Sequence, residues 1–218
     1  MLFCASKVLD FSAGWGDRLS GFLAADCVQD ITLIEPRASA CVAYKQQHGL
    51  VQSGKVLCVV QGCAEVQLSL LQPSFDLILS SPPYAAVERY THTEGEPPQA
   101  WQKFKTVQQF QVGFLQPVIV QAARLLNEAG VFVLNVDNCV SAPGLCEFTL
   151  KCAVDSGLVL IGTCGLAKST GKCEPIYLFA KPNNVQWSRQ LLQPVQRQVH
   201  CADALMWLRQ HKDHSLGP

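Results

Sequence analysis

Apolar residues along this chain fall into short runs separated by segments with helical spacing. Seven runs have the length of a buried strand: 7–10, 31–35, 55–60, 75–80, 131–136, 158–163 and 176–180. Between several of these runs, apolar side chains return every three or four residues, as they do on one face of a helix. Strands that alternate with helices are typical of a parallel sheet covered on both faces. The pattern therefore predicts an α/β fold built on a seven-stranded sheet.

Two of the predicted helices can be described in more detail. A helix over 40–47 is expected to end at Gly49, because glycine commonly follows the last turn of a helix. The longest connection opens with polar, proline-rich sequence and continues with an amphipathic helical pattern over 101–126. Gly113 and Pro117 interrupt that pattern and predict a kink or a restart of the helix.

Length and composition indicate one ordered domain. The chain has 218 residues, of which 49% are hydrophobic and 16% are charged, enough apolar sequence to bury a core without disulfides or metal. We expect a folded domain over 1–181. The remainder, 182–218, is interpreted as a C-terminal extension with a short helix at 202–208 and a loose tail.

The apolar runs are too short to cross a bilayer, and residues 1–6 lack the features of a secretory signal. We therefore expect an intracellular protein, cytoplasmic or nuclear, with no membrane partner. The eleven cysteines include no CxxC pair, and those in or beside apolar segments, such as Cys41, Cys58, Cys152 and Cys164, are interpreted as reduced buried thiols. The histidines show no ligand spacing, so no metal is expected.

The charge balance gives no electrostatic signature of a polyanion-binding protein. Lysine and arginine total 17, and aspartate and glutamate total 17. Two interpretations remain open for the basic residues outside the predicted strands: scattered solvated charges, or a local patch that contacts phosphates. The patch would consist of Lys103, Lys105, Arg124, Lys168 and Lys172.

The first predicted strand leads into a glycine turn that suits a nucleotide-containing ligand. Residues 8–16 read VLDFSAGWG, and Gly14 and Gly16 allow the backbone to approach a bulky ligand closely. Asp10, at the end of the strand, can accept hydrogen bonds from a cationic amine. Glu35 ends the next strand, 19 residues after Gly16, where an acid commonly binds the ribose hydroxyls of an adenosine cofactor.

Two other interpretations of this segment are open. The glycines could form an ordinary turn between strand and helix, with Glu35 as a solvated charge at a strand end. A nicotinamide dinucleotide could also bind after the first strand, but its fingerprint requires a third glycine, and Leu19 occupies that position.

The strand over 75–80 runs directly into Ser81, Pro82, Pro83 and Tyr84. The two prolines end the strand abruptly and make the backbone after it rigid. The Ser81 hydroxyl and the Pro82 carbonyl could accept the hydrogens of an aromatic amino group and direct its lone pair, while Tyr84 stacks on the ring. A rigid loop without a catalytic role is the alternative interpretation.

These segments resemble the S-adenosylmethionine-dependent amino-methyltransferases. The glycine turn is similar to their first motif, Ser81–Tyr84 is similar to their (Asp/Asn/Ser)-Pro-Pro-(Tyr/Phe/Trp) motif, and Cys63 and Ala64 stand where the family has a Gly-Asp-Ala-like turn. The resemblance implies a Rossmann-like methyltransferase fold with strand order three, two, one, four, five, seven, six and an antiparallel seventh strand. It also implies S-adenosylmethionine as cofactor, bound by Asp10, Phe11, Ser12, Gly14, Gly16, Glu35, Cys63 and Ala64.

The resemblance extends to the phage and giant-virus DNA methyltransferases. Glu88 and Tyr90 follow the Ser-Pro-Pro-Tyr motif at similar spacings, which implies contact with the substrate, and 174–181 is similar to the final strand of those proteins. The implied reaction is methylation of an exocyclic amino group of a DNA or RNA base, cytosine or adenine, with serine at the first motif position favouring cytosine slightly.

Because no target-recognition domain follows the motifs, we expect an unpaired base as target or a partner protein that presents it. Two alternatives stay open. One is methylation of a protein glutamine amide, whose nitrogen the same motif can hold. The other is a catalytically inactive, methyltransferase-like binding module, suggested by Cys63 in place of the family's acid.

Overall fold

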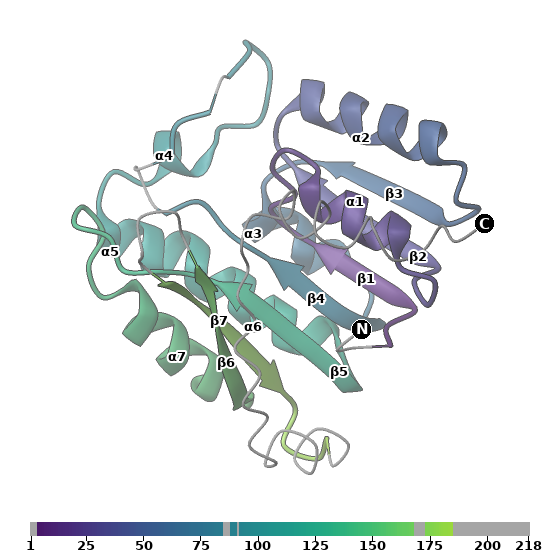
Figure 1. Ribbon diagram of the computed structural model, residues 1–218. Helices are drawn as coiled ribbons and strands as arrows, with labels where there is room; N and C mark the ends of the chain where they lie inside the picture. Colours follow the sequence, from purple (N-terminus) through teal and green to yellow (C-terminus); the bar gives the residue numbers. More distant parts are fainter. Residues whose placement is uncertain (1–3, 85–87, 91, 168–172, 185–218) are drawn as a thin grey trace.

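The structure of the protein is a computed structural model that describes residues 4–84, 88–90, 92–167 and 173–184. A seven-stranded sheet forms its centre, and helices pack on both sides of it (Figure 1). The strand order is β3-β2-β1-β4-β5-β7-β6. β7 pairs antiparallel with both β5 and β6, and the other strand pairs are parallel. The predicted fold class, the strand order and the antiparallel seventh strand are therefore confirmed.

The strands are β1 (Lys7–Asp10), β2 (Asp30–Glu35), β3 (Val56–Gln61), β4 (Phe75–Ser80), β5 (Leu126–Asn135), β6 (Val159–Ala167) and β7 (Cys173–Ala180). The helices are α1 (Asp17–Ala24), α2 (Ala38–Val51), α3 (Ala64–Gln67), α4 (Ala100–Lys103), α5 (Val107–Phe110), α6 (Gln116–Leu125) and α7 (Leu145–Asp155). A 3₁₀ turn η1 (Leu68–Leu70) follows α3, and a π-helix η2 (Gln111–Leu115) joins α5 to α6.

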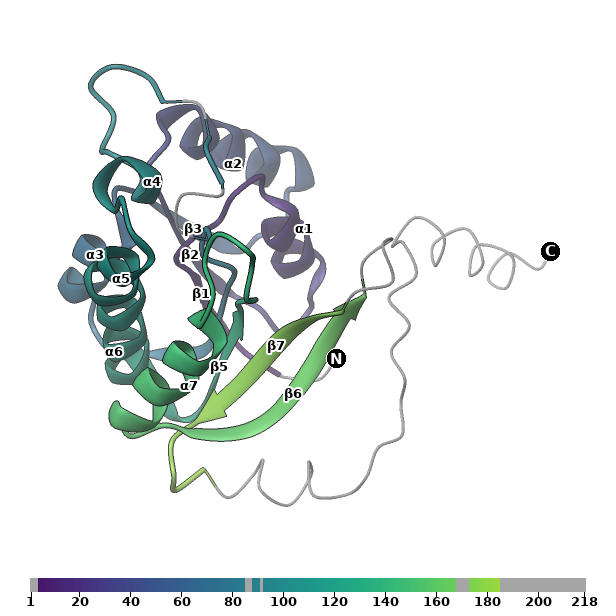
Figure 2. The same cartoon turned by 90° about the vertical axis from the view of Figure 1, so that its left-hand side faces the viewer.

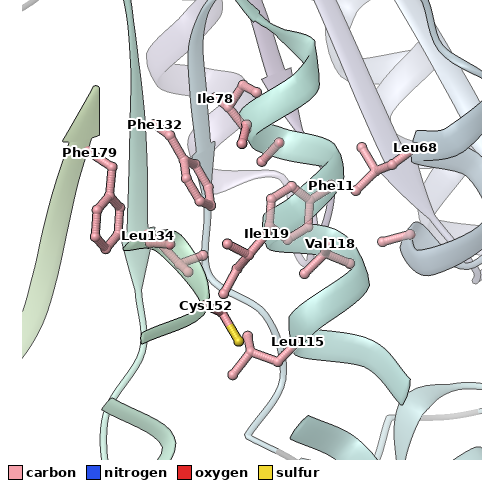
Figure 3. Packing of buried hydrophobic residues seen from close by; sticks show 14 of the residues in the cluster. Phe11, Leu68, Ile78, Leu115, Val118, Ile119, Phe132, Leu134, Cys152 and Phe179 are labelled. Carbon is pink, nitrogen blue, oxygen red and sulfur yellow. The ribbon is translucent and has the colours of Figure 1, made fainter. Parts of the chain in front are cut away.

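Apolar side chains fill both spaces between the sheet and its helices. On one face, α6 and α7 pack Val118, Ile119 and Cys152 against Phe132 and its neighbours on the strands (Figure 3). On the other face, α1 and α2 cover β1 and β2 (Figure 2). Because β1 and β4 are buried on both faces, they read as nearly continuous apolar runs, which is why the sequence located them so closely. β5 begins at Leu126, five residues before the predicted run 131–136, because its first residues include the exposed Glu128 and Ala129.

Parallel pairing brings polar residues at the strand ends to one edge of the sheet. Val8 pairs with Leu77 and Asp10 pairs with Leu33, so that β1 ends beside β2 and β4. Ser80 pairs with Leu134, which places Asn135 beside the residue that follows β4. The register thus gathers Asp10, Glu35, Ser80 and Asn135 at the edge from which the connecting loops rise.

The predicted end of the second helix at Gly49 is wrong. α2 continues to Val51 and ends at Gln52, whose backbone adopts a left-handed conformation (φ 48°) and whose N–H bonds the His48 carbonyl. Gly49 is exposed, with open space where a Cβ would lie, so that a helical backbone passes through it without obstruction. A glycine permits a helix end but does not require one.

The helical pattern over 101–126 is divided in the structure. Trp101 lies in the separate short helix α4, and Leu126 already begins β5. The expected irregularity occurs as the π-helix η2, which contains Gly113 and leads into α6 with Pro117 near its start. A Cβ at Gly113 would collide with the Phe104 ring, so glycine lets α4 and its following loop pack closely there.

The prediction that the cysteines are buried holds for Cys41 and Cys152 and is wrong for Cys58 and Cys164, which are exposed. Cys58 lies on β3 and Cys164 on β6, the two outer strands of the described sheet. Apolar sequence on an outer strand does not imply burial, because, within the described sheet, an outer strand pairs with only one other strand and its second edge has no strand beside it. Among the described residues, no helix is both long and apolar enough to span a membrane. The helix expected at 202–208 lies outside the described residues.

Candidate active site

An open pocket lies at the edge of the sheet where β1, β2 and β4 end. Its lining includes the turn after β1, Glu35 at the end of β2, and Ser81 directly after β4. Proteins with parallel α/β sheets bind their ligands outside the carboxyl ends of the strands, and this pocket lies in that position. The structure therefore brings the glycine turn, the predicted ribose acid and the Ser-Pro-Pro motif to one cavity.

The glycine turn is fastened to β2 and α2 through Gly14. The Gly14 N–H donates to Glu35 Oε2 (3.2 Å), and the Gly14 carbonyl accepts from the Tyr44 hydroxyl (2.6 Å) and from Arg37 Nη2 (2.7 Å). Gly14 and Gly16 both have positive φ angles, 62° and 92°, which strain any residue with a Cβ. Their glycines are thus required by the turn itself.

Asp10 is fully buried and is not part of the pocket lining. Its carboxylate accepts from Arg18 Nε (2.6 Å), from the Ser80 hydroxyl (2.9 Å) and from the Ser12 N–H (3.1 Å). Burial lowers the pKa of Arg18 and the Asp10 carboxylate raises it, and the net result is a raised pKa. Asp10 was expected to accept a hydrogen bond from a cationic amine of the cofactor. In the structure its carboxylate instead forms a salt bridge with Arg18, which does line the pocket.

Glu35 lies in the pocket lining but is paired with Arg37. Glu35 Oε1 accepts from Arg37 Nε (2.7 Å), and its other oxygen accepts from Gly14 and lies 3.5 Å from the Tyr44 hydroxyl. Both side chains of the pair are buried, with 4% and 7% of their surfaces exposed. Burial lowers the pKa of Arg37 while Glu35 raises it, and the net pKa is raised, so Arg37 keeps its positive charge at neutral pH.

Two aromatic rings that contact each other edge to face lie against the Arg37 guanidinium. Its central carbon lies 4.7 Å from the Trp15 ring centroid and 4.9 Å from the Tyr90 ring centroid, within the range of cation–π attraction. The Tyr90 hydroxyl donates a hydrogen bond to Glu88. The resemblance implied that Glu88 and Tyr90 contact a substrate. In the structure both line the pocket, and Tyr90 contacts Arg37, the partner of Glu35.

The cavity measures about 190 Å³. Small-molecule sites commonly hold about 300–1,000 Å³, so a cofactor of ordinary size needs more room than this conformation provides. Arg18 and Arg37 both line the cavity. Movement of one or both arginines is the simplest way to enlarge it, since each is a long side chain with several rotatable bonds.

The segment before α4 reaches across to α2 (Figure 1), and its residues Pro98 and Gln99 line the pocket. The Glu96 carboxylate accepts from the Ala38 N–H at the start of α2 (2.7 Å), and the Cys63 thiol donates to the Pro98 carbonyl (3.2 Å). Cys63 and Ala64 line the pocket as expected. Burial raises the pKa of the Cys63 thiol, so that it stays protonated and acts as a donor.

Ser81 and Pro83 of the Ser-Pro-Pro-Tyr motif line the pocket, whereas Pro82 is buried. The Ser81 hydroxyl donates to Asn135 Oδ1 (3.2 Å). Tyr84 is not part of the lining; it is partly buried and packs against the hydrophobic core near Ser81. The structure therefore gives Ser81 direct access to a ligand, and it gives the Tyr84 ring a position behind the pocket wall.

Two members of the predicted basic patch, Lys103 and Arg124, bind other groups of the protein. Lys103 is bonded to Glu65, and Arg124 donates to the carbonyls of Leu68 and Leu71. Lys103 also neutralises the charge of Glu65, which is the acidic residue nearest to Cys63 in sequence. Lys168 and Lys172 lie outside the described residues.

A smaller cationic group surrounds Trp101, which lines the pocket. Arg89 and Lys105 lie 5.8 Å and 6.0 Å from its ring centroid. In the part of the chain that the structure describes, no cluster of three or more histidine, cysteine or acidic side chains could hold a metal ion.

Several residues of the site escaped the sequence analysis: Trp15, Arg18, Arg37, Ser80, Gln99 and Asn135. A signal existed for the arginines, because Arg37 follows Glu35 by two residues and Arg18 follows Gly16 of the glycine turn by two residues. Asn135 stood out only as a polar residue at the end of an apolar strand.

The four tyrosines of the chain, at positions 44, 84, 90 and 177, all have raised pKa values, and burial is the largest cause in each case. Unfolded tyrosine titrates near pH 10. Because the folded pKa values lie higher, the stabilisation by neutral phenols is complete below about pH 10 and is lost as the pH rises through the folded values.

We therefore expect the free energy of unfolding to fall above about pH 10, with tyrosinate absorbance appearing together with unfolding. Parallel titrations by ultraviolet absorbance and circular dichroism would measure both. Tyrosinate that forms near pH 10 with an intact circular dichroism spectrum would contradict the burial of these phenols.

No protein-family model matches the sequence, and no curated protein does. Solved structures do match its fold. TrmN from Thermus thermophilus is 15% identical with a TM-score of 0.55, and the match covers 81% of this chain and 44% of that one. The chain thus spans less than half the length of TrmN.

Two further structures match over most of both chains. A TehB-like SAM-dependent methyltransferase from Corynebacterium glutamicum is 19% identical, with a TM-score of 0.51 and coverage of 81% and 80%. A protein from Clostridium thermocellum assigned as an rRNA-methylase is 8% identical, with a TM-score of 0.53 and coverage of 80% and 84%. At these identities the similarity concerns the fold, which is the Rossmann-like fold of methyltransferases.

Proposed function

We propose that this protein is an S-adenosylmethionine-dependent methyltransferase that acts on an exocyclic amino group of a nucleic acid base, cytosine or adenine. The observation that carries the proposal is the shared pocket. The glycine turn with Glu35 and the hydroxyl of Ser81 line one cavity at the carboxyl ends of the strands. A methyl donor and a methyl acceptor must meet in such a place for transfer to occur.

The residues of the pocket fit the chemical groups of S-adenosylmethionine. Glu35 offers a carboxylate to the ribose hydroxyls, which would take the place of the Arg37 guanidinium. Arg18 offers a cation to the carboxylate of the cofactor, and Pro36, Cys63 and Ala64 line the part of the pocket next to Glu35. When bound, the cofactor supplies a methyl group made electrophilic by its sulfonium.

Ser81 can assist the acceptor. An aromatic amine is a poor nucleophile because its lone pair is delocalised into the ring. The Ser81 hydroxyl oxygen would accept a hydrogen from this amine and help to localise the lone pair. The cofactor would supply the methyl group, whose bond to sulfur would break as its bond to the nitrogen forms, and one proton would leave the nitrogen for solvent.

The surroundings of Trp101 support a nucleic acid as substrate. An aromatic ring flanked by cations is the arrangement that binds stacked bases and their phosphates in single strands, and Trp101 with Arg89 and Lys105 forms one at the pocket. The fold is also shared with the Clostridium thermocellum protein assigned as an rRNA-methylase.

A catalytically inactive binding module is the second candidate. It is favoured by the arginines on both predicted cofactor acids, because a cofactor must compete with the Arg37 guanidinium for Glu35. Absence of any calorimetric heat with S-adenosylmethionine or its demethylated product would favour this candidate over the enzyme.

The test is transfer of a labelled methyl group to matched single-stranded and double-stranded DNA and RNA, over a series of salt concentrations. We expect faster methylation of single strands, because extrusion of a paired base costs a few kcal/mol. The balanced charge of the chain also predicts a shallow salt dependence. Faster methylation of intact duplex would contradict the unpaired target, and transfer only to glutamine-containing peptides would replace the base by a protein amide.

A further inference from the structure

We propose that Asn135 is a positioning residue that fixes the direction of the Ser81 hydroxyl. The inference rests on the proposed methyl transfer, and it concerns how Ser81 comes to act as an acceptor rather than as a donor toward its target. A hydroxyl can do either, so its usefulness depends on where its single hydrogen points.

The orientation of the Asn135 amide is fixed by β7. Asn135 ends β5, where it pairs with Ile176, and its Nδ2 lies 3.0 Å from the carbonyl oxygen of Pro175. A backbone carbonyl only accepts hydrogen bonds, so the group that faces it must be the NH₂ end of the amide. The oxygen end, Oδ1, then faces Ser81.

This orientation determines the role of the Ser81 hydroxyl. Asn135 Oδ1 lies 3.2 Å from Ser81 Oγ and carries no hydrogen, so Ser81 must be the donor in this contact. The one hydrogen of Ser81 is thereby used, and both lone pairs of its oxygen remain. Ser81 lines the pocket. Any further partner that Ser81 meets there must bring a hydrogen of its own, as an amino group does.

Ser81 is therefore a directed acceptor toward the pocket. Its hydrogen is held by Asn135, a side chain that does not itself line the pocket.

The inference predicts a specific pattern of kinetic effects. Asn135→Ala frees the Ser81 hydrogen to turn toward the amine, so kcat should fall about tenfold, the effect of one hydrogen bond, with the affinity for S-adenosylmethionine unchanged. In a Ser81→Ala background the same substitution should change kcat no further, because Asn135 acts through Ser81.

Asn127→Ala is the matched control. Asn127 lies on the same strand, and its amide bonds Asp76 at the opposite end of β5 from Ser81. Its replacement removes a side-chain hydrogen bond of similar kind and should leave kcat unchanged. An equal fall in kcat for Asn127→Ala and Asn135→Ala would overturn the inference. So would a tenfold fall in kcat when Asn135→Ala is added to Ser81→Ala.

A second measurement separates this inference from the proposed function. If the unmodified chain transfers no methyl group to any substrate, the proposed function fails, and the hydrogen bond is examined by nuclear magnetic resonance instead. The side-chain amide resonances of Asn135 should shift in Ser81→Ala and not in Asn127→Ala. Asn135 resonances that are unchanged in Ser81→Ala would overturn the inference irrespective of activity.

Discussion

Replacement of Ser81 by alanine is expected to lower methyl transfer by about 100-fold or more, the effect of removing one positioned hydrogen-bond partner of a transition state. Ser81 lines the pocket directly after β4, and its side chain carries the acceptor oxygen that the proposed reaction requires. The affinity for S-adenosylmethionine should change little, because Glu35 and the glycine turn remain. Single-turnover rates with labelled cofactor and calorimetric binding would measure the two effects separately.

Ser81→Thr is the natural control, since threonine keeps the hydroxyl and adds one methyl group. It should retain more transfer than Ser81→Ala at equal cofactor occupancy. Equal losses of cofactor binding and turnover in Ser81→Ala would instead mean that the Ser-Pro-Pro-Tyr segment serves only to shape the loop.

Replacement of Glu35 by alanine is expected to weaken binding of S-adenosylmethionine, because both ribose hydrogen bonds are lost. It should also lower the free energy of unfolding by about 3–5 kcal/mol, as when one partner of a buried ion pair is removed. Arg37 is only 3% exposed and would lose its charged partner. The Gly14 N–H would lose its acceptor as well. Urea denaturation and titration calorimetry of the same preparations would measure both effects.

The double variant Glu35→Gln/Arg37→Met distinguishes the two roles of this carboxylate. It removes both charges at once, so it should be more stable than Glu35→Ala while still binding cofactor poorly. Arg37→Met alone should bind cofactor at least as well as the unmodified chain, because the ribose no longer competes with a guanidinium. Unaltered stability and binding in Glu35→Ala would show that the pair contributes to neither.

The sequence predicted β1 and β4 well because they are buried on both faces, and such strands appear as uninterrupted apolar runs. It predicted the end of α2 wrongly because the choice between stopping and continuing at Gly49 depends on hydrogen bonds formed by Gln52. It also assigned burial to Cys58 and Cys164 because their apolar neighbours do not show that a strand lies at the edge of the sheet.

The sequence predicted which backbone segments form the candidate site, but it did not predict the salt bridges within it. The residue spacing identified the glycine turn, Glu35 and Ser81, since these positions follow from strand ends and turn geometry. The salt bridges of Arg18 with Asp10 and of Arg37 with Glu35 depend on side-chain conformations, which composition and periodicity do not predict. Asn135 could be assigned a role only when strand order placed β5 beside β4.

The hydrogen bond from the Ser80 hydroxyl to Asp10 has a consequence for protein engineering. It joins the strand that precedes the Ser-Pro-Pro-Tyr segment to the carboxylate that holds Arg18 at the glycine turn, across 70 residues of sequence. The two segments are therefore not interchangeable modules. A transplant of 81–99 from another protein into this scaffold should keep Ser80, Asp10 and Arg18 together, because a loop swap that includes Ser80 would also alter the opposite wall of the cavity.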